Sequence, residues 1–318
     1  MSEERDSLER RPRLAPVSTG KRITLQETDR VWLAKLAEHG PLPSSFLLAY
    51  TAAKRRSGKR ARERLTDLFH EENTPDGGRY LDRPPQQFRT LDSRYNQLVY
   101  DLAPAGRKAL GEAANKRARS GPWLHEFMVA CITASIELET RERSDLEFIP
   151  AAAILDRAEA TLRYPVTFAE PGLREPITKD LVPDALFGLR YRTSTGDRFR
   201  FFLVEADRGT EPQTSGTWHR KSLRRTLLQY RAYVGGGGYR EHLRLTAPLL
   251  VLTITTSNER MERLCRLIEA DVPDAAPYML FQSWEAFGTV FRPPEPNPPL
   301  LRAPYRRAGG TEFRIDRP

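Results

Sequence analysis

Cysteine and long apolar runs are scarce in this sequence, and each scarcity excludes a class of protein. The 318 residues include only two cysteines, Cys131 and Cys265. Both lie in segments with helical periodicity and without the paired spacing of a zinc site, so we expect reduced core thiols rather than a disulfide or metal ligands. No apolar run approaches the ~20 residues that a membrane-spanning helix needs. The N-terminal segment is charged and has no apolar signal core, which predicts a cytoplasmic protein without a membrane partner.

Lysine is also scarce, although positive charge is abundant. The chain has 51 basic and 42 acidic residues, a net charge of +9, and only eight of the basic residues are lysine. The codon usage of a GC-rich genome accounts for the arginines as well as arginine-specific recognition does. The charge excess favours a polyanionic partner, because counterions are released when a protein neutralises phosphates. An inert basic surface would have the same composition.

The length predicts two domains, since domains of ~100–200 residues are the norm. Prolines and mixed charges without periodicity indicate disorder at the N-terminal end. Five prolines before Ala303, followed by arginines, indicate an extended and poorly packed C-terminal end. The expected organisation is a disordered arm (1–22), a first domain (23–114), a linker (115–122), a second domain (123–290) and a proline- and arginine-rich tail (291–318).

Three helices and a β ribbon are expected in the first domain. Thr24 and Glu27 have the spacing of a capping box, and the apolar stripe that follows contains Trp32, Leu33 and Leu36. Helices and strands in this order are typical of a winged helix-turn-helix DNA-binding domain. The expected elements are helices over 24–39, 44–53 and 58–70, a turn over 73–78, strands over 79–81 and 97–100, and a helix over 101–110.

Basic side chains gather where the third of these helices begins. Residues 54–64 contain seven basic side chains and one acid, Glu63. A recognition helix presents its N-terminal turn to the major groove of double-stranded DNA, so this position predicts DNA contact. The alternative is a solvated helix face with no ligand. The predicted DNA-binding residues are Lys54, Arg55, Arg56, Lys59, Arg60 and Arg64.

The second domain alternates helices with strands, which predicts an α/β fold with a mixed sheet flanked by helices. The segment over 247–256 is almost wholly apolar, as in a central strand that is covered on both faces. Thr193 to Asp197 predict a hairpin turn. The expected elements are helices over 123–139, 218–234 and 259–270 and strands over 146–150, 182–192, 199–207, 247–256 and 278–284.

Acidic residues lie at the ends of the two hairpin strands. Asp184 follows Pro183 at the start of one strand, and Glu205 and Asp207 are near the end of the next. Because side chains alternate across a strand, Glu205 and Asp207 share a face, and the hairpin can bring Asp184 beside them. Three converging carboxylates repel one another unless a cation lies among them, and oxygen ligands suit Mg²⁺ or Mn²⁺. A metal there can activate water for phosphodiester cleavage.

These residues carry a resemblance to known families. Pro183-Asp184, a hairpin and then Glu205-Ala206-Asp207 resemble the PD-(D/E)xK nuclease signature, and the element order over 121–290 resembles the restriction-endonuclease-like core. The chain over 23–290 resembles the replication-relaxation family, which includes atypical relaxases of mobilisable plasmids. The stretch from Phe202 to Thr210 and the Trp123-Leu124-His125 opening of a helix are similar to that family.

The resemblance implies DNA nicking in plasmid replication or mobilisation. It implies that Asp184 and Glu205 ligate Mg²⁺ or Mn²⁺, with the Ala206 carbonyl as a further ligand, and that His125 occupies a family position without an assigned role. The sequence departs from the nuclease pattern at Asp207, where a lysine is expected, so a cation elsewhere must replace it or cleavage is lost. The predicted catalytic set is Asp184, Glu205, Asp207 and Lys221, and Arg208 and Lys179 are further candidates for the replacement.

Other interpretations remain open. Glu205 and Asp207 could pair with Arg190 or Arg208, and His125 could be an ordinary core histidine. Tyr230 lies on an apolar stripe, so a tyrosine–DNA bond is not expected. The chain could then be a non-catalytic winged-helix regulator with a degenerate nuclease-like domain, or an adaptor that uses its proline-rich tail. Double-stranded DNA is the expected partner, and other replication or mobilisation proteins are implied by the resemblance. A homodimer is also open, since winged helices often bind palindromes as dimers, although nothing in the sequence specifies a dimer seam.

Overall fold

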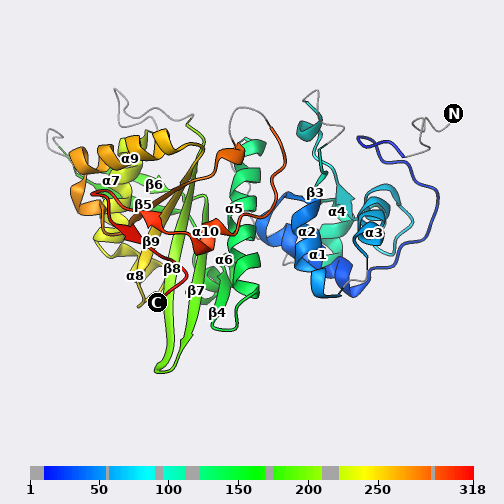
Figure 1. Cartoon of the computed structure of the whole chain (residues 1–318), viewed down its shortest axis with the longest axis horizontal. Coiled ribbons are helices and arrows are strands. Elements are labelled where there is room, and N and C mark those ends of the chain that lie inside the picture. Colours follow the sequence, from blue (N-terminus) through cyan, green and yellow to red (C-terminus); the bar gives the residue numbers. More distant parts are fainter. Residues whose placement is uncertain are drawn as a thin grey trace. The chain divides into compact units, whose positions relative to one another are not determined.

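The chain divides into two compact units, one formed by residues 1–134 with 290–296 and the other by 135–289 with 297–318. Helices and strands are mixed, with helices predominant at the N-terminal end and a large sheet in the second unit (Figure 1). In this computed structural model the described residues are 11–54, 57–89, 96–111, 122–169, 175–209, 222–287 and 291–318. No helix in those ranges is both long enough and apolar enough to cross a bilayer.

The described part of the first unit contains the four helices α1 to α4, two short 3-10 helices and a small antiparallel sheet. The strand order is β1-β3-β2, with Leu42 opposite Tyr100 and Leu81 opposite Leu102. The helix boundaries differ from the expected ones by a few residues, as frayed ends usually do. The elements are α1 (Glu27–His39), β1 (Leu42–Pro43), α2 (Ser44–Tyr50), η1 (Ala52–Lys54), α3 (Gly58–His70), β2 (Leu81–Asp82), η2 (Pro85–Phe88), β3 (Val99–Leu102) and α4 (Pro104–Leu110).

Helix α1 begins at Glu27, three residues later than the start expected from the sequence. Its capping box is formed by Gln26 and Asp29, not by the expected Thr24 and Glu27. Asp29 is a charged residue, yet it is fully buried. Its carboxylate accepts hydrogen bonds from the Gln26 backbone and from the guanidinium of Arg64 on α3. Asp29 therefore joins α1 to α3 through a partly buried hydrogen bond with Arg64.

Helix α3 follows the predicted range. The Ser57 hydroxyl accepts from the backbone N–H of Arg60, so one of the unpaired donors at the helix start is satisfied. The buried stripe of α3 is Ala61, Leu65, Leu68 and Phe69, as the periodicity predicts. The polar face of the N-terminal half is therefore left to solvent.

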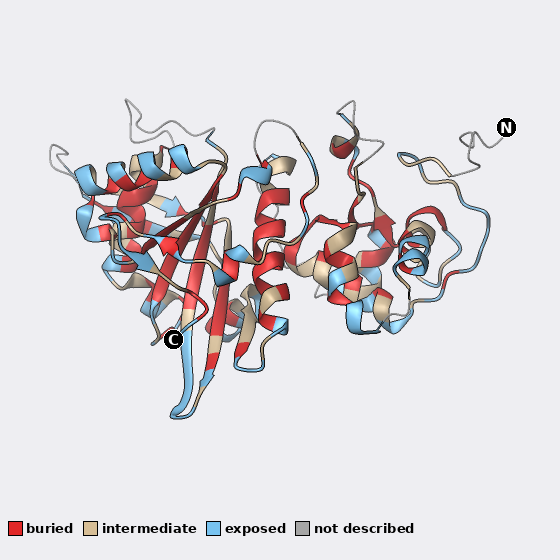
Figure 2. Ribbon diagram, viewed as in Figure 1, coloured by how far each residue is buried: buried red, intermediate tan, exposed pale blue. Residues whose placement is uncertain are grey.

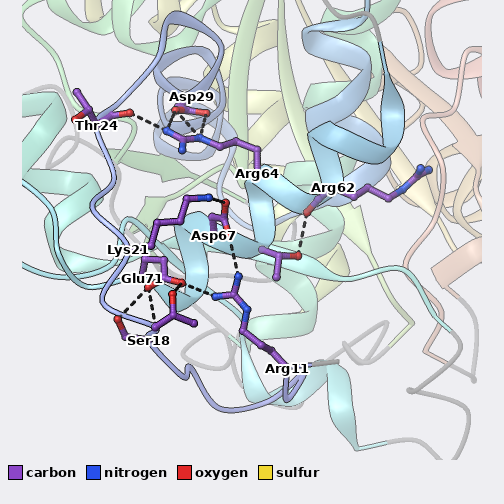
Figure 3. A network of polar contacts seen from close by, with 11 residues as sticks. Arg11, Ser18, Lys21, Thr24, Asp29, Arg62, Arg64, Asp67 and Glu71 are labelled. Atoms are coloured by element: carbon purple, nitrogen blue, oxygen red, sulfur yellow. Dashed lines mark hydrogen bonds and ion pairs between the residues drawn. The ribbon is translucent and has the colours of Figure 1, made fainter. Parts of the chain in front are cut away.

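Residues 11–22, expected to be disordered, pack instead on the C-terminal half of α3 (Figure 3). The fully buried Glu71 accepts hydrogen bonds from Arg11, Ser18 and Thr19, and Asp67 is paired with Arg11 and Lys21. The basic residues Arg11 and Lys21, which show no periodic pattern in the sequence, are thus ion-pair partners of α3, about fifty residues away. Residues 1–10 of the predicted arm lie outside the described residues.

The anchoring of this arm is expected to fail in mild acid. The Val17 N–H donates to His70 Nδ1 at 2.9 Å, which requires a neutral imidazole. Burial, and then the charges of Arg83 and Arg11, lower the pKa of His70 from 6.5 to about 4. Burial would raise the pKa of Glu71, but the Thr19, Ser18 and Arg11 hydrogen bonds outweigh it, so that pKa is also lowered.

Both folded-state pKa values lie below the unfolded ones, so the stabilisation is present at neutral pH and is lost as the pH falls. Between pH 6.5 and pH 4 we expect amides 17–19 to lose hydrogen-exchange protection, measured by mass spectrometry after correction for intrinsic rates. His70→Gln, which cannot titrate, should flatten this dependence above pH 4.5. Protection that is unchanged down to pH 4.5 in the wild type would contradict the prediction.

The second unit contains a seven-stranded mixed sheet with the order β12-β11-β10-β9-β8-β7-β4. Strands β8, β9 and β10 are parallel to one another, and the other pairs are antiparallel. A separate pair, β5 and β6, is also antiparallel. The strands are β4 (Leu146–Pro150), β5 (Tyr164–Phe168), β6 (Ile177–Leu181), β7 (Ala185–Thr193), β8 (Gly196–Asp207), β9 (Leu249–Thr255), β10 (Met279–Ser283), β11 (Tyr305–Arg306) and β12 (Glu312–Phe313).

The core of this unit lies on both faces of the sheet. All seven residues of β9 are buried, as its apolar run predicted, because β9 is central and covered on both sides (Figure 2). One face packs against helices through a cluster that includes Leu203, Val251 and Leu264. On the other face Phe148, Phe187 and Phe202 stack. Helix α5 (Trp123–Arg141) contributes its residues up to Ala134 to the first unit and the rest to the second. The other helices of the second unit are α6 (Ala151–Ala158), α7 (Leu223–Tyr230), η5 (Arg231–Gly235), α8 (Gly238–His242), α9 (Asn258–Asp271), η6 (Pro273–Ala275), η7 (Glu285–Phe287) and α10 (Pro299–Arg302).

The C-terminal segment is not the poorly packed tail that its prolines suggested. Strand β11 pairs with β10, and β12 pairs with β11. Leu300, Leu301, Tyr305 and Ile315 are fully buried. Five of the seven prolines precede Leu300, and the apolar residues that follow them supply the burial that the expectation overlooked.

Candidate functional site: the carboxyl edge of the parallel strands

Polar residues occupy the ends of the parallel strands β8 and β9. This edge of the sheet lies opposite the tip of the β7–β8 hairpin (Figure 1). In the register of these strands Glu205 is beside Thr253 and Asp207 is beside Thr255. Helix α9 begins just after β9 and is capped by Ser257. In open α/β sheets this edge is the usual location of ligand sites.

Asp184 marks the point where the β7–β8 ladder ends. Its N–H donates to the Val204 carbonyl at 3.1 Å, and its side-chain Oδ2 accepts from the Ala206 N–H at 2.8 Å. The Asp184 carboxylate thus accepts the hydrogen bond that a backbone carbonyl would accept if the β7–β8 ladder continued. Asp184 lies one step beyond the paired residues Ala185 and Val204, which puts it opposite Glu205. The hairpin therefore brings these two acids together, as the sequence predicted.

Glu205 is held by a buried tyrosine. The Tyr230 hydroxyl, on α7, donates to Glu205 Oε1. Burial raises the pKa of Tyr230 well above its ordinary value, and the negative charges of Glu205 and Asp184 raise it further. The phenol is therefore protonated and acts as a hydrogen-bond donor that orients the Glu205 carboxylate.

Asp207 has a different environment. Arg260, in the first turn of α9, donates from Nε to Asp207 Oδ2 at 2.7 Å and from Nη2 to Oδ1 at 3.3 Å. The Gly209 N–H also donates to Oδ1. The partners considered from sequence were Arg190 and Arg208, but Arg190 is paired with Asp197 and Glu147.

The sequence predicted that the three carboxylates converge on one point, and this prediction does not hold in the structure. Among the described residues, Asp184, Glu205 and Asp207 do not form a set with one oxygen of each within 4.8 Å of the others. Two acids face each other across the ladder, and the third is neutralised by an arginine. The oxygen donors that remain together, Asp184, Glu205 and the Ala206 carbonyl, are of the type that Mg²⁺ and Mn²⁺ prefer.

The other predicted site residues are spread over the chain. Lys221 lies outside the described residues. Lys179 is on β6, where its carbonyl accepts from Gln229 of α7, and Arg208 follows β8 with a buried Nε that has no partner in the described ranges. His125 is partly buried in the first turn of α5, which belongs to the first unit.

The candidate DNA-binding residues divide into three groups. Lys59 and Arg60 are exposed on α3, and the nearby Arg62, which the sequence-based set omitted, is exposed as well. Lys54 pairs with Glu27 at an exposed position, and Arg55 and Arg56 lie outside the described residues. Arg64 bonds Asp29 and the Thr24 carbonyl, so the DNA contact predicted for it does not fit this arrangement.

Arg260 is the main residue that the sequence reasoning missed. It lies 53 positions after Asp207, and no local pattern joins the two. One signal was present: Arg260 precedes Leu264 and Ile268 at four-residue intervals, on the buried stripe of α9. A charged residue on an apolar stripe requires a buried partner.

Comparison with known proteins identifies the family. No curated protein and no solved structure matches the chain. A family model described as replication-relaxation matches residues 33–249, which is more than half of the chain and includes Asp184, Glu205 and Asp207. This chain therefore belongs to the replication-relaxation family.

Proposed function

We propose that the protein is a metal-dependent DNA-nicking enzyme whose first unit recognises double-stranded DNA. Membership of the replication-relaxation family points to a role in plasmid replication or mobilisation. The observation that carries the nicking proposal is the pair of facing acids Asp184 and Glu205 at the carboxyl edge of the sheet, with Asp184 bonded to the backbone of Ala206.

The first unit supports the DNA-binding part. Helices α1, α2 and α3 with an antiparallel ribbon of the order β1-β3-β2 support a winged helix-turn-helix, a motif in which the third helix enters the major groove. Lys59, Arg60 and Arg62 project from the exposed face of this helix near its N-terminal end. Cations there can neutralise phosphates and release counterions.

The second unit supports the metal-dependent part. A divalent cation would be held by Asp184, Glu205 and the Ala206 carbonyl, since these are oxygen donors on adjacent positions of two paired strands. A bound Mg²⁺ or Mn²⁺ lowers the pKa of water and stabilises charge on the leaving oxygen. Tyr230 keeps the Glu205 carboxylate in one orientation.

The reaction would be hydrolysis of one phosphodiester. A water oxygen forms a bond to phosphorus, and the bond from phosphorus to one ribose oxygen breaks, with the electron pair leaving on that oxygen. The attacking water loses a proton to solvent, and the ribose oxygen takes one up. Asp184 and Glu205 would hold the cation at a fixed position relative to the sheet.

The runner-up function is that of a non-catalytic DNA-binding regulator. The observation that favours it is the Asp207–Arg260 ion pair, which occupies the place where the nuclease pattern has a lysine. If this pair is only structural, the second unit is a scaffold and the protein acts through the first.

Nicking of supercoiled DNA tests the proposal. We expect the wild-type protein to convert a supercoiled plasmid that carries the sequence flanking its own gene to open circles with Mg²⁺ or Mn²⁺. The same reaction with EDTA should leave the plasmid supercoiled, because the acids alone cannot activate water. Binding of the DNA without any cutting, at either metal, would favour the regulator.

A further inference from the structure

The ion pair between Asp207 and Arg260 is nearly excluded from solvent. Each side chain is 10% exposed, and the guanidinium meets the carboxylate through two of its nitrogens, Nε and Nη2. A two-point contact of this kind fixes the plane of the guanidinium as well as its position. Arg260 is thus presented in one orientation.

Stability alone does not account for a buried ion pair at this position. Burial of two charges costs about as much as their attraction returns, and apolar residues of similar volume often do equally well. The next arginines of α9, Arg263 and Arg266, are exposed, and within the described residues they pair with acids one turn away on the same helix. Arg260 instead lies on the buried stripe and reaches the strand end that carries Glu205.

Arg260 has N–H donors that Asp207 does not engage. A guanidinium has five N–H donors, of which Asp207 engages those on Nε and Nη2. Within the described ranges Nη1 has no hydrogen-bond partner. The local charge without Arg260 is that of three carboxylates, so an anionic substrate could not approach the edge unless cations offset it.

We propose that Arg260, held in place by Asp207, contacts a phosphate of the DNA at the scissile position and so takes the role of the absent lysine. Asp207 is then a positioning residue for Arg260 and not a metal ligand. The proposal rests on the nicking function above. Arg260 lies beyond the residues 33–249 that match the family model, so the family match says nothing about it.

The chemistry asked of Arg260 is electrostatic. Its N–H groups donate to a non-bridging phosphate oxygen on which negative charge increases as the water oxygen bonds to phosphorus. No bond to Arg260 forms or breaks, and it transfers no proton, because a guanidinium is not deprotonated in proteins. Lys221, Arg208 and Lys179, the candidates from sequence, are not required for this role.

A charge-neutral double variant tests the proposal. Asp207→Asn/Arg260→Gln keeps a hydrogen-bonded pair of similar size and leaves the net charge unchanged, because one negative and one positive charge are lost together. A thermal unfolding midpoint close to that of the wild type establishes that the variant is folded. We expect nicking at saturating DNA to fall about 100- to 1,000-fold, as when one preorganised donor is removed from an active site. Mn²⁺ affinity, measured by calorimetry, should change less than about threefold, since the proposed metal ligands are untouched.

A second readout does not depend on cleavage. DNA affinity is measured at several salt concentrations at 4 °C with Ca²⁺ in place of Mg²⁺. The plot of log affinity against log salt concentration should have a slope about 0.9 smaller in magnitude for the double variant than for the wild type, because one phosphate contact is lost. A merely structural role of the pair would leave this slope unchanged. Arg260→Lys, which keeps a cation without the two-point contact, should lose about tenfold in nicking.

A rescue variant makes the test specific. Asp207→Lys/Arg260→Ala puts a lysine where the nuclease pattern has one and should recover nicking to within about tenfold of the wild type. If the wild type nicks and Asp184→Ala does not, yet Asp207→Asn/Arg260→Gln nicks at the wild-type rate with the wild-type salt slope, the role of Arg260 is overturned and the nicking function stands. If the wild type never nicks, both proposals fall.

Discussion

Asp184→Asn and Glu205→Gln should each lower the rate of plasmid nicking by at least about 1,000-fold, because each replaces a carboxylate ligand of the proposed metal site by a neutral amide. These changes are sharper than substitution by alanine. The amide oxygen introduced at position 184 can still accept from the Ala206 N–H, and the one introduced at position 205 can still accept from Tyr230. Alanine at position 205 would leave the buried Tyr230 hydroxyl without its acceptor, which costs about 1–3 kcal/mol of stability.

The loss of nicking is to be measured on supercoiled DNA with Mn²⁺, alongside calorimetric titration of the metal. Mn²⁺ binding should weaken in step with the rate, while affinity for DNA, which is assigned to the first unit, stays within about twofold. Asp180→Asn is the matched control, since Asp180 is an exposed acid of the same unit that pairs with Arg163 on its own hairpin. Retention of nicking by both amide variants would refute the metal site.

The parts of the fold that follow from local patterns were predictable. The apolar run of β9 indicated a central strand, the turn at Thr193 indicated the β7–β8 hairpin, and alternation put Glu205 and Asp207 on one face. Each of these depends on neighbours within about ten residues. For the same reason α3 was predicted within a residue or two of its observed range.

The parts that depend on distant partners were not predictable in the same way. Helix α6 and strands β5 and β6 were missed, because they have only 8, 5 and 5 residues and are stabilised by packing against one another and against the sheet. The helix expected over 218–234 is observed as α7 followed by a π-helical turn from Arg231. The register of a sheet and the length of a helix both respond to tertiary contacts that local propensity does not contain.

The sequence predicted the positions of Asp184 and Glu205 in the candidate site but not the environment of Asp207. The facing of Asp184 and Glu205 follows from hairpin geometry, which sequence can supply. The fate of Asp207 could not be inferred, because its partner comes from a helix on the far side of β9 in the chain. The sequence argument considered the repulsion among three carboxylates but did not include Arg260, which neutralises Asp207.

The arginines of α3 should separate into two groups when they are changed. Replacing Lys59, Arg60 and Arg62 together by alanine should weaken DNA binding about 100-fold and reduce the salt slope by about 3, because three exposed cations that contact phosphates are lost. These side chains make no ion pair within the described part of the chain, so the thermal unfolding midpoint should hardly move. Fluorescence anisotropy on a labelled duplex at several salt concentrations measures the affinity and the slope.

Arg64→Ala should have the opposite profile. The Arg64 side chain is 18% exposed and Asp29 is fully buried, and the guanidinium donates to Asp29 at 2.7 Å and to the Thr24 carbonyl. Removal of one partner from a buried ion pair leaves the other charge uncompensated, at a cost of about 3–5 kcal/mol. Denaturant unfolding of the variant should show this loss, while the folded fraction binds DNA with nearly the wild-type affinity and the same salt slope. A variant that keeps its stability but loses one unit of slope would instead assign Arg64 to the DNA, and the ion pair with Asp29 would then have to open on binding.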